Sequence, residues 1–167
     1  MRDQERLIVA EIPRFRRYAR ALTGDPAAAD DLVQDCLERA WGRFHLWRRG
    51  SNLRAWMFTI MHNLHANAVR RAKSRPQTFP LEEARAATGA RQDDALAIRG
   101  LARALAQLPE DQRRVVLLVG LEEMSYAEAA RVLGVPIGTV MSRLSRGRDR
   151  LRGLMSGEGP AAVTRMK

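Results

Sequence analysis

Residues 108–152 read LPEDQRRVVLLVGLEEMSYAEAARVLGVPIGTVMSRLSRGRDRLR, and this stretch decides the fold class. Ser125 precedes an apolar-periodic segment and Glu128 follows three residues later, which is the spacing of a helix capping box. Gly134 suits the positive φ of a helix C-terminus, and Pro136 suits the first position of a second helix. The pattern predicts a short helix over 126–133, a tight turn and a basic second helix. This is the arrangement of a helix-turn-helix that reads the DNA major groove.

The second helix has an apolar face and a polar face when its residues are placed at about 100° intervals. The apolar face is predicted to pack inward and carries Val140, Leu144, Gly147 and Leu151. The polar face carries hydroxyls, which can bond phosphates, and arginines, which can bond guanine in a bidentate way. We take four of its residues as candidate major-groove contacts: Thr139, Ser142, Arg143 and Arg146. A solvated basic face without a ligand is the alternative, and the capped helix and glycine turn before it favour DNA contact.

Composition agrees with a polyanionic partner, because the 167 residues carry a formal net charge of +10. The chain shows neither a signal peptide nor an apolar run long enough to span a bilayer, so a cytoplasmic location is expected. Cys36 is the only cysteine, which excludes an intramolecular disulfide and a cysteine-based zinc site. We expect Cys36 to be a small buried residue.

Helical periodicity along the chain predicts an all-α protein of two small helical domains joined by a flexible linker. We expect a first domain over 1–75 and a linker over 76–94, where prolines, alanines and acidic residues replace the periodic pattern. A second domain is expected over 95–155, followed by a disordered tail over 156–167.

The first domain contains a predicted helix over 28–41 whose outward face is acidic. Its inward stripe is expected to include Cys36 and Trp41. The outward face carries Asp31, Gln34, Asp35 and Glu38. Two interpretations stay open for these residues: a solvated face, or a surface for a protein partner.

A second predicted helix spans 53–72 and has a wide apolar face and a basic end. The basic end indicates phosphate contact, and an asparagine amide on the border can bond a base edge. The candidate contacts to nucleic acid are Asn63, Thr59, His62, Arg70 and Arg71. We expect Trp41 and Trp56 to be core residues. His62 and His65 lack a third ligand nearby, so we expect no metal site.

Three segments together resemble the extracytoplasmic-function type of bacterial RNA polymerase sigma factor. The segment DDLVQDCLERAW (30–41) resembles the helix that binds the polymerase clamp. The segment LRAWMFTIMHNLHANAVRR (53–71) resembles the part that melts the promoter and reads the −10 element, and residues 108–152 resemble the domain that reads the −35 element. In that family the first two segments belong to region 2 and the third belongs to region 4.

The resemblance implies a protein that binds core RNA polymerase, directs it to promoter DNA and helps open the duplex. It implies no catalytic site, no cofactor, no small-molecule substrate and no binding to a membrane. The acidic face of 30–41 would contact the clamp helices of the largest catalytic subunit, and the polymerase flap would be a second contact. Asn63 would hold a flipped-out base of the −10 element, and the loop 45–52 would form the wall of that base pocket. Thr139, Ser142, Arg143 and Arg146 would lie in the −35 major groove.

Met141 and Ser145 depart from the basic and bulky residues that relatives often carry, so the −35 preference is expected to differ and Arg146 to carry more of it. The segment RYARALTGD (17–25) is most similar to the general-stress branch, whose members are held inactive by a small helical anti-sigma factor. A stand-alone helix-turn-helix regulator and a sigma-like adaptor that titrates an anti-sigma factor are the alternatives. An enzyme has little support, because the chain shows no nucleophile–base pair or phosphate loop.

Overall fold

The computed structural model describes residues 2–74 and 92–157, and the regular structure in these two ranges is helical. The predicted all-α fold is therefore confirmed. The elements are α1 (Asp3–Thr23), α2 (Pro26–Gly42), the short helix η1 (Phe44–Leu46), α3 (Leu53–Lys73), α4 (Gln92–Ala106), α5 (Glu110–Val116), the π-helical turn η2 (Leu117–Leu121), α6 (Tyr126–Leu133) and α7 (Ile137–Met155). Within the described ranges, every helix is too short or too polar to cross a membrane.

The predicted linker, 76–94, lies almost entirely outside the described residues. Its last three residues are described, and they form the first turn of α4, so the helix begins earlier than predicted. Asp93 and Asp94 account for the difference, because carboxylates stabilise the positive end of the helix dipole. Beyond Gly157 the predicted tail also lies outside the described residues.

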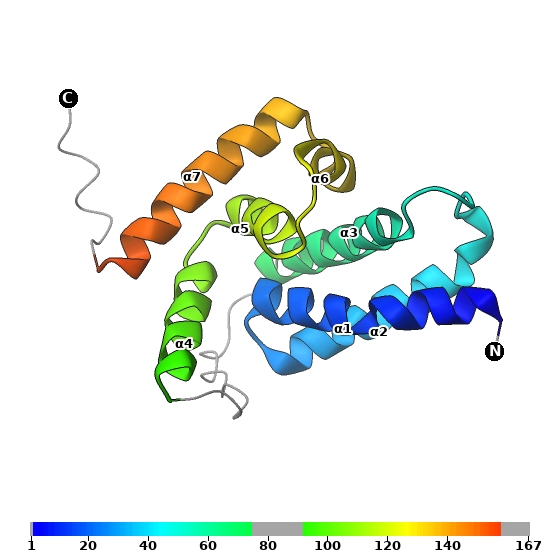
Figure 1. Ribbon diagram of the computed structural model, residues 1–167, viewed down its shortest axis with the longest axis horizontal. Coiled ribbons are helices and arrows are strands. Elements are labelled where there is room, and N and C mark those ends of the chain that lie inside the picture. The colour runs from blue at the N-terminus through cyan, green and yellow to red at the C-terminus, as the bar shows by residue number, and fades with distance from the viewer. Residues whose placement is uncertain (1, 75–91, 158–167) are drawn as a thin grey trace.

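The N-terminal half is a bundle of α1, α2 and α3 built around aromatic side chains (Figure 1). Phe58 on α3 packs against Phe15 on α1 with ring centroids 4.5 Å apart, and it meets Tyr18 edge-on at 4.9 Å. All three rings are buried, and aromatic side chains bury more apolar area per residue than any other type. Cys36 on α2 is buried in the same core, as predicted.

Local signals in the sequence set the helix boundaries of this half. Gly24 has a φ of 69° at the end of α1, and the Asp25 carboxylate accepts hydrogen bonds from the first free amides of α2. Asn52 caps α3 in the same way, accepting from the amide of Ala55 at 3.1 Å. The helices predicted over 28–41 and 53–72 are thus observed as α2, which is three residues longer than predicted, and α3, which is one residue longer.

The helix-turn-helix is formed by α6 and α7. The Ser125 hydroxyl accepts from the Glu128 amide and the Glu128 carboxylate accepts from the Ser125 amide, both at 3.1 Å, so the predicted capping box is confirmed. Gly134 ends α6 with a φ of 66°. The prediction for Pro136 was wrong by one position: it is the N-cap with extended backbone, and α7 begins at Ile137.

The inward face of α7 is also as predicted. Val140, Leu144 and Gly147 are buried, and Leu151 is half-buried against the core. Gly147 lies so close to α5 that an added Cβ would stand 2.8 Å from Cγ2 of Val116. The absence of a side chain at Gly147 therefore allows the close packing of α7 on α5.

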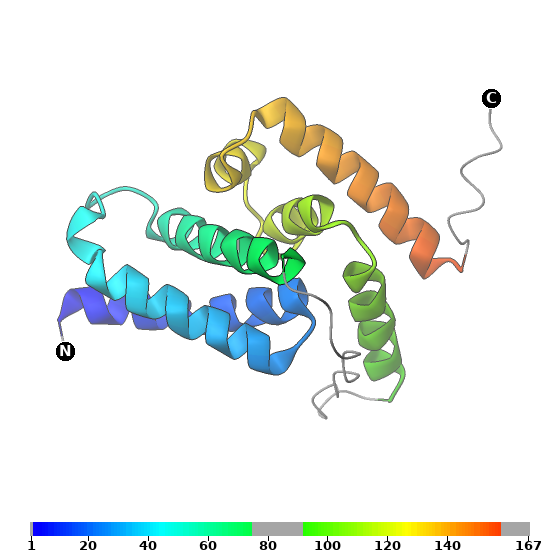
Figure 2. The ribbon, with the colours of Figure 1, turned by 180° about the vertical axis from the view of Figure 1, so that it is seen from behind.

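The two halves pack against each other. In Figures 1 and 2, α6 lies beside α3 and α4 lies beside the end of α1, and the contacts of α3 with α6 and of α1 with α4 and η2 agree with these views. The start of the helix-turn-helix therefore lies against the helix that carries Asn63.

Candidate nucleic-acid and partner-binding surfaces

The polar face of α7 presents side chains that are held by the buried apolar face behind it. Arg146 and Ser142 are exposed, and the Ser142 hydroxyl donates to the carbonyl of Thr139 at 3.2 Å. Thr139 is half-buried in the first turn. Arg146 thus extends from a rigid helix into solvent, which is the arrangement that direct base readout requires.

Arg143 differs from the other predicted contacts on α7. Its Nε lies 3.6 Å from Oδ2 of Asp111 on α5, and 30% of its side chain is exposed. The ion pair holds the guanidinium against α5. Of the two predicted major-groove arginines, Arg143 is therefore paired with an acidic residue in the structure, whereas Arg146 is exposed.

A shallow groove lies between the start of α6 and the outer face of α7. Met141 is 52% exposed and lies in this groove with Ser145. The groove is also lined by Tyr126, Leu144, Arg148, Asp149 and Arg152. The two positions that depart from the relatives' residues are therefore accessible and adjacent to Ser142 and Arg146.

The predicted nucleic-acid face of α3 is only partly open. Asn63 is exposed, whereas His62 and Thr59 are half-buried and the Thr59 hydroxyl donates to the carbonyl of Ala55 at 2.9 Å. Farther along α3, Arg70 and Arg71 are exposed, as a phosphate-contacting cluster would be. Arg70 donates hydrogen bonds to neighbouring groups of its own helix.

The two histidines of α3 face a cation. Burial, together with the nearby Arg114 guanidinium, lowers the pKa of His62 and of His65 from 6.5 to about 4. His65 is 7% exposed, and its Nδ1 lies 3.3 Å from Nη2 of Arg114. Both rings are therefore neutral at pH 7, and they belong to the contact between the two halves of the chain.

The loop that the resemblance assigns to a base-pocket wall, 45–52, precedes α3. Trp47 packs on Phe44 with ring centroids 5.3 Å apart and is half-buried, whereas Leu46 is 65% exposed. The side-chain amide of Asn52, which caps α3, donates to Oε1 of Glu128 on α6 at 3.3 Å. The loop is thus anchored at both ends, with apolar and basic side chains exposed between them.

The acidic face of α2 is fully open. Asp31, Gln34, Asp35 and Glu38 are all exposed, and Gln34 donates to Glu38 at 3.1 Å along the helix. The structure therefore brings these four residues onto one surface, as predicted.

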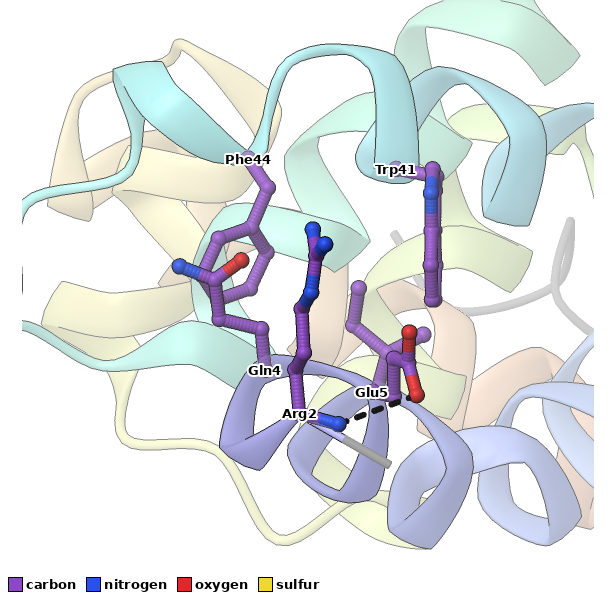
Figure 3. A pocket seen from close by; sticks show the side chains of 6 residues that line it. Arg2, Gln4, Glu5, Trp41 and Phe44 are labelled. Carbon is purple, nitrogen blue, oxygen red and sulfur yellow. Dashed lines mark hydrogen bonds between the residues drawn. The ribbon is translucent and has the colours of Figure 1, made fainter.

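The prediction of Trp41 as a core residue was wrong, because its side chain is 53% exposed. Phe44 and Ile8 close this end of the bundle, and the indole stands outside them beside the start of α1 (Figure 3). Trp41 follows Gln34 by seven residues and Glu38 by three, so it lies on the acidic face. This spacing in the sequence could have identified Trp41 as an exposed residue of the acidic face. The prediction for Trp56 holds better, since it is half-buried and packs on the core.

Comparisons with known proteins match each half of the chain to a protein family. Residues 8–62 match the family described as "Sigma2 domain of PhyR", and residues 98–151 match "Sigma-70, region 4". The ECF RNA polymerase sigma factor EcfG of Rhodopseudomonas palustris is 36% identical over 153 residues, which cover 91% of this chain and 84% of that protein. SigC, an ECF RNA polymerase sigma factor of Mycobacterium tuberculosis, is 35% identical over 138 residues, which cover 78% of this chain and 72% of that protein.

The fold is also similar to a solved structure. The sigma factor RpoE of Bartonella quintana, in complex with the anti-sigma factor NepR, superposes with a TM-score of 0.77 at 31% identity, and the match covers 93% of this chain and 98% of that one. Because the match covers 93% of this chain, the likeness extends to both halves.

Proposed function

The chain belongs to the extracytoplasmic-function RNA polymerase sigma factors, and from this premise we propose that it binds core RNA polymerase, directs it to promoters and helps to open the duplex there. Such a protein acts where the polymerase is, in the cytoplasm. The polymerase supplies the catalytic chemistry, and the sigma factor supplies recognition.

The acidic face of α2 is the observation that carries the polymerase contact. The chain has a net charge of +10, and acidic residues elsewhere, among them Glu11, Glu110 and Glu122, form ion pairs with arginines. Asp31, Asp35 and Glu38 form no ion pair with any residue that the structure describes, and they share one exposed face. Unpaired acidic residues on a rigid helix suit a basic protein surface, and we assign the face to the clamp helices of the polymerase.

Trp41 extends the proposed polymerase contact. A half-exposed indole next to a charged stripe is typical of an interface anchor, because tryptophan buries a large area with few rotatable bonds. Asp31, Gln34, Asp35 and Glu38 would set orientation and on-rate, and Trp41 would contribute desolvated apolar contact. The flap of the polymerase is proposed as the second contact, with the C-terminal half.

Promoter recognition is assigned to two surfaces. The exposed Arg146 and Ser142 on α7, with Thr139, would read the −35 duplex, and Arg143 would contribute a phosphate contact once free of Asp111. Asn63, with Thr59 and His62, would hold an extruded base of the −10 element, and Arg70 and Arg71 would bind the backbone. Capture of an extruded base offsets part of an unstacking cost of a few kcal/mol, so recognition and melting are coupled.

Regulation by an anti-sigma factor is proposed from the likeness to RpoE of Bartonella quintana, which was solved in complex with NepR. The match of residues 8–62 to the sigma2 domain of PhyR and the identity with EcfG support the general-stress branch. The partner would be a small protein that covers polymerase-binding surface.

Run-off transcription with reconstituted holoenzyme on a genomic library tests the proposal. We expect specific transcripts that require this chain and share −35 and −10 sequences. Mobility-shift assays with and without core polymerase form the second arm, because a sigma factor binds promoter DNA weakly alone. Tight sequence-specific binding of the free chain, with no transcript from holoenzyme, would show a stand-alone regulator instead.

A further inference from the structure

The basic helix α7 carries exposed apolar side chains among its arginines. Met141 is 52% exposed, and Ile137, one turn earlier on the same side of the helix, is 49% exposed. Tyr126, at the start of α6, lines the same groove as Met141 and is 38% exposed. One exposed apolar side chain is ordinary on a protein surface, whereas several on neighbouring helices indicate a binding surface.

The groove around Met141, about 250 Å³ in volume, combines apolar and positively charged groups. Met141 and the buried Leu144 supply apolar lining, and the exposed Arg148 and Arg152 supply positive charge. Arg152 pairs with Asp149 at 3.0 Å, whereas Arg148 forms no ion pair with any residue that the structure describes. This combination suits a ligand that has both an apolar group and negative charges. The major groove of DNA offers both, because pyrimidine methyl groups lie in it and phosphates border it.

Met141 lies on one flank of the exposed face of α7, and Arg146 lies on the other. At 100° per residue the two side chains are about 140° apart around the helix, and Ser145 and Ser142 come between them. Both serines are small and exposed, and the Ser142 hydroxyl donates to the carbonyl of Thr139. Base pairs can therefore approach the middle of this face closely, while the two longer side chains extend to either side.

The thioether of Met141 limits what this side chain can recognise in DNA. It has no hydrogen-bond donor and only a weakly accepting sulfur, so it cannot bond a phosphate or distinguish the polar edges of bases. Its flexible, polarisable chain packs well on small apolar groups. The apolar group in the major groove is the 5-methyl of a pyrimidine, which thymine carries and unmodified cytosine lacks.

We propose that Met141 is a specificity-determining residue that packs on the 5-methyl group of a pyrimidine in the −35 element. Five residues separate Met141 from Arg146, or about 7.5 Å along the helix axis, which corresponds to roughly two base pairs. The methyl group therefore lies within about three base pairs of the base that Arg146 reads. The inference rests on the proposed function, because it assigns one more side chain of the −35 surface.

Removal of single methyl groups from the promoter tests the contact. Holoenzyme is reconstituted on a promoter defined by run-off transcription, and each −35 thymine of either strand is replaced in turn by deoxyuridine, which lacks only the methyl group. A second series replaces each cytosine by 5-methylcytosine, which presents the same group. Competition binding compares the wild type with Met141→Ala and Met141→Leu. The matched control is Met155→Ala, which removes a 50% exposed methionine from the far end of α7.

We expect deoxyuridine at one position to weaken wild-type binding about fourfold, as loss of one buried methyl group does. Met141→Ala should bind the thymine and deoxyuridine duplexes equally at that position, Met141→Leu should keep the discrimination, and Met155→Ala should match the wild type. Where the contacted base is a cytosine, 5-methylcytosine instead tightens wild-type binding about fourfold and leaves Met141→Ala unaffected. The two series therefore identify which base carries the methyl group.

Two results would overturn the methyl contact and leave the proposed function standing. One is a wild-type holoenzyme that transcribes specifically but binds every deoxyuridine and 5-methylcytosine duplex as tightly as the unmodified promoter. The other is a Met141→Ala holoenzyme that keeps the wild-type preference for the methyl group, which would show that Met141 only packs on α6. A wild-type holoenzyme that makes no specific transcript would overturn the proposed function and the methyl contact with it.

Discussion

Arg143 on α7 forms an ion pair with Asp111 on α5, with 3.6 Å between Nε and Oδ2, whereas Arg146 one turn along is exposed. Two arginines on the same polar face of α7 therefore have different environments. Because the Asp111 carboxylate competes with DNA for Arg143, the two should contribute differently to promoter recognition.

We expect Arg146→Ala to weaken −35 recognition by roughly 1–3 kcal/mol and to change the ranking of −35 variants, as loss of a bidentate base contact would. Arg143→Ala should lower transcription from all −35 variants by a similar, smaller factor. Run-off transcription on a set of single-base −35 variants measures both effects. An unchanged ranking in Arg146→Ala would show that Arg146 contacts phosphate only.

Asn63 is exposed on α3 beside the half-buried Thr59 and His62. We expect Asn63→Ala to reduce open-complex formation about tenfold, since a hydrogen bond to an extruded base contributes about 1–1.5 kcal/mol, and to leave −35 binding nearly unchanged. Permanganate reactivity of melted thymines measures opening, and a shift assay with holoenzyme measures binding. Equal losses in the two assays would contradict base capture.

Charge reversal on α2 tests the polymerase contact. Asp31→Lys with Asp35→Lys should weaken core binding by about tenfold or more without loss of helix content, because both side chains are exposed and their replacement leaves the core intact. Asp94→Lys on α4 is the control with the same type of charge change at an exposed site. Fluorescence anisotropy with labelled core polymerase gives the affinity, and an unchanged value for the double variant would exclude this face.

Much of the fold could be predicted because the decisive signals are local. The capping box of Ser125 and Glu128 and the glycine at 134 act within one helical turn, and the structure reproduces them. Contacts between residues far apart in the chain could not be predicted. Periodicity placed Trp41 in the inward stripe, whereas the structure leaves it exposed at the end of the bundle, where Phe44 and Ile8 are buried.

The same limit applies to the candidate site. The acidic face of α2 follows from helical geometry and was predicted correctly as an exposed set. The engagement of Arg143 by Asp111 and of Glu122 by Arg17 depends on how helices from different segments meet. Neither pair has a sequence spacing that would indicate it.

Stability should fall with acidification because of the histidines between the halves. The folded pKa of His65 is about 4, below its ordinary 6.5, and the facing groups Arg113 and Arg114 oppose its protonation. As the pH falls below 6.5 the unfolded chain takes up the proton first, so the stabilisation is complete above that value and decreases toward pH 4.

For His65 alone this amounts to about 2 kcal/mol lost between pH 7 and pH 5. His65→Gln should therefore flatten the pH dependence of the free energy of unfolding measured in urea, whereas His45→Gln, at an exposed site, should retain the wild-type slope. Identical slopes for His65→Gln and the wild type would show that the ring is not buried in its neutral form.

Gly147 should tolerate no side chain, although it lies within a helix. Its added Cβ would stand 2.8 Å from Cγ2 of Val116 and 3.4 Å from Cβ of Gln112, so α7 must move away from α5. Overpacking of this kind costs about 1–3 kcal/mol, which exceeds the gain of ~1 kcal/mol from replacing a helical glycine with alanine. Gly147→Ala should lower the Tm, while Gly138→Ala in the same helix, where an added Cβ meets nothing within 4 Å, should raise it slightly. Thermal unfolding by circular dichroism compares the two, and a rise in Tm for both would show that α7 and α5 are less closely packed than the structure indicates.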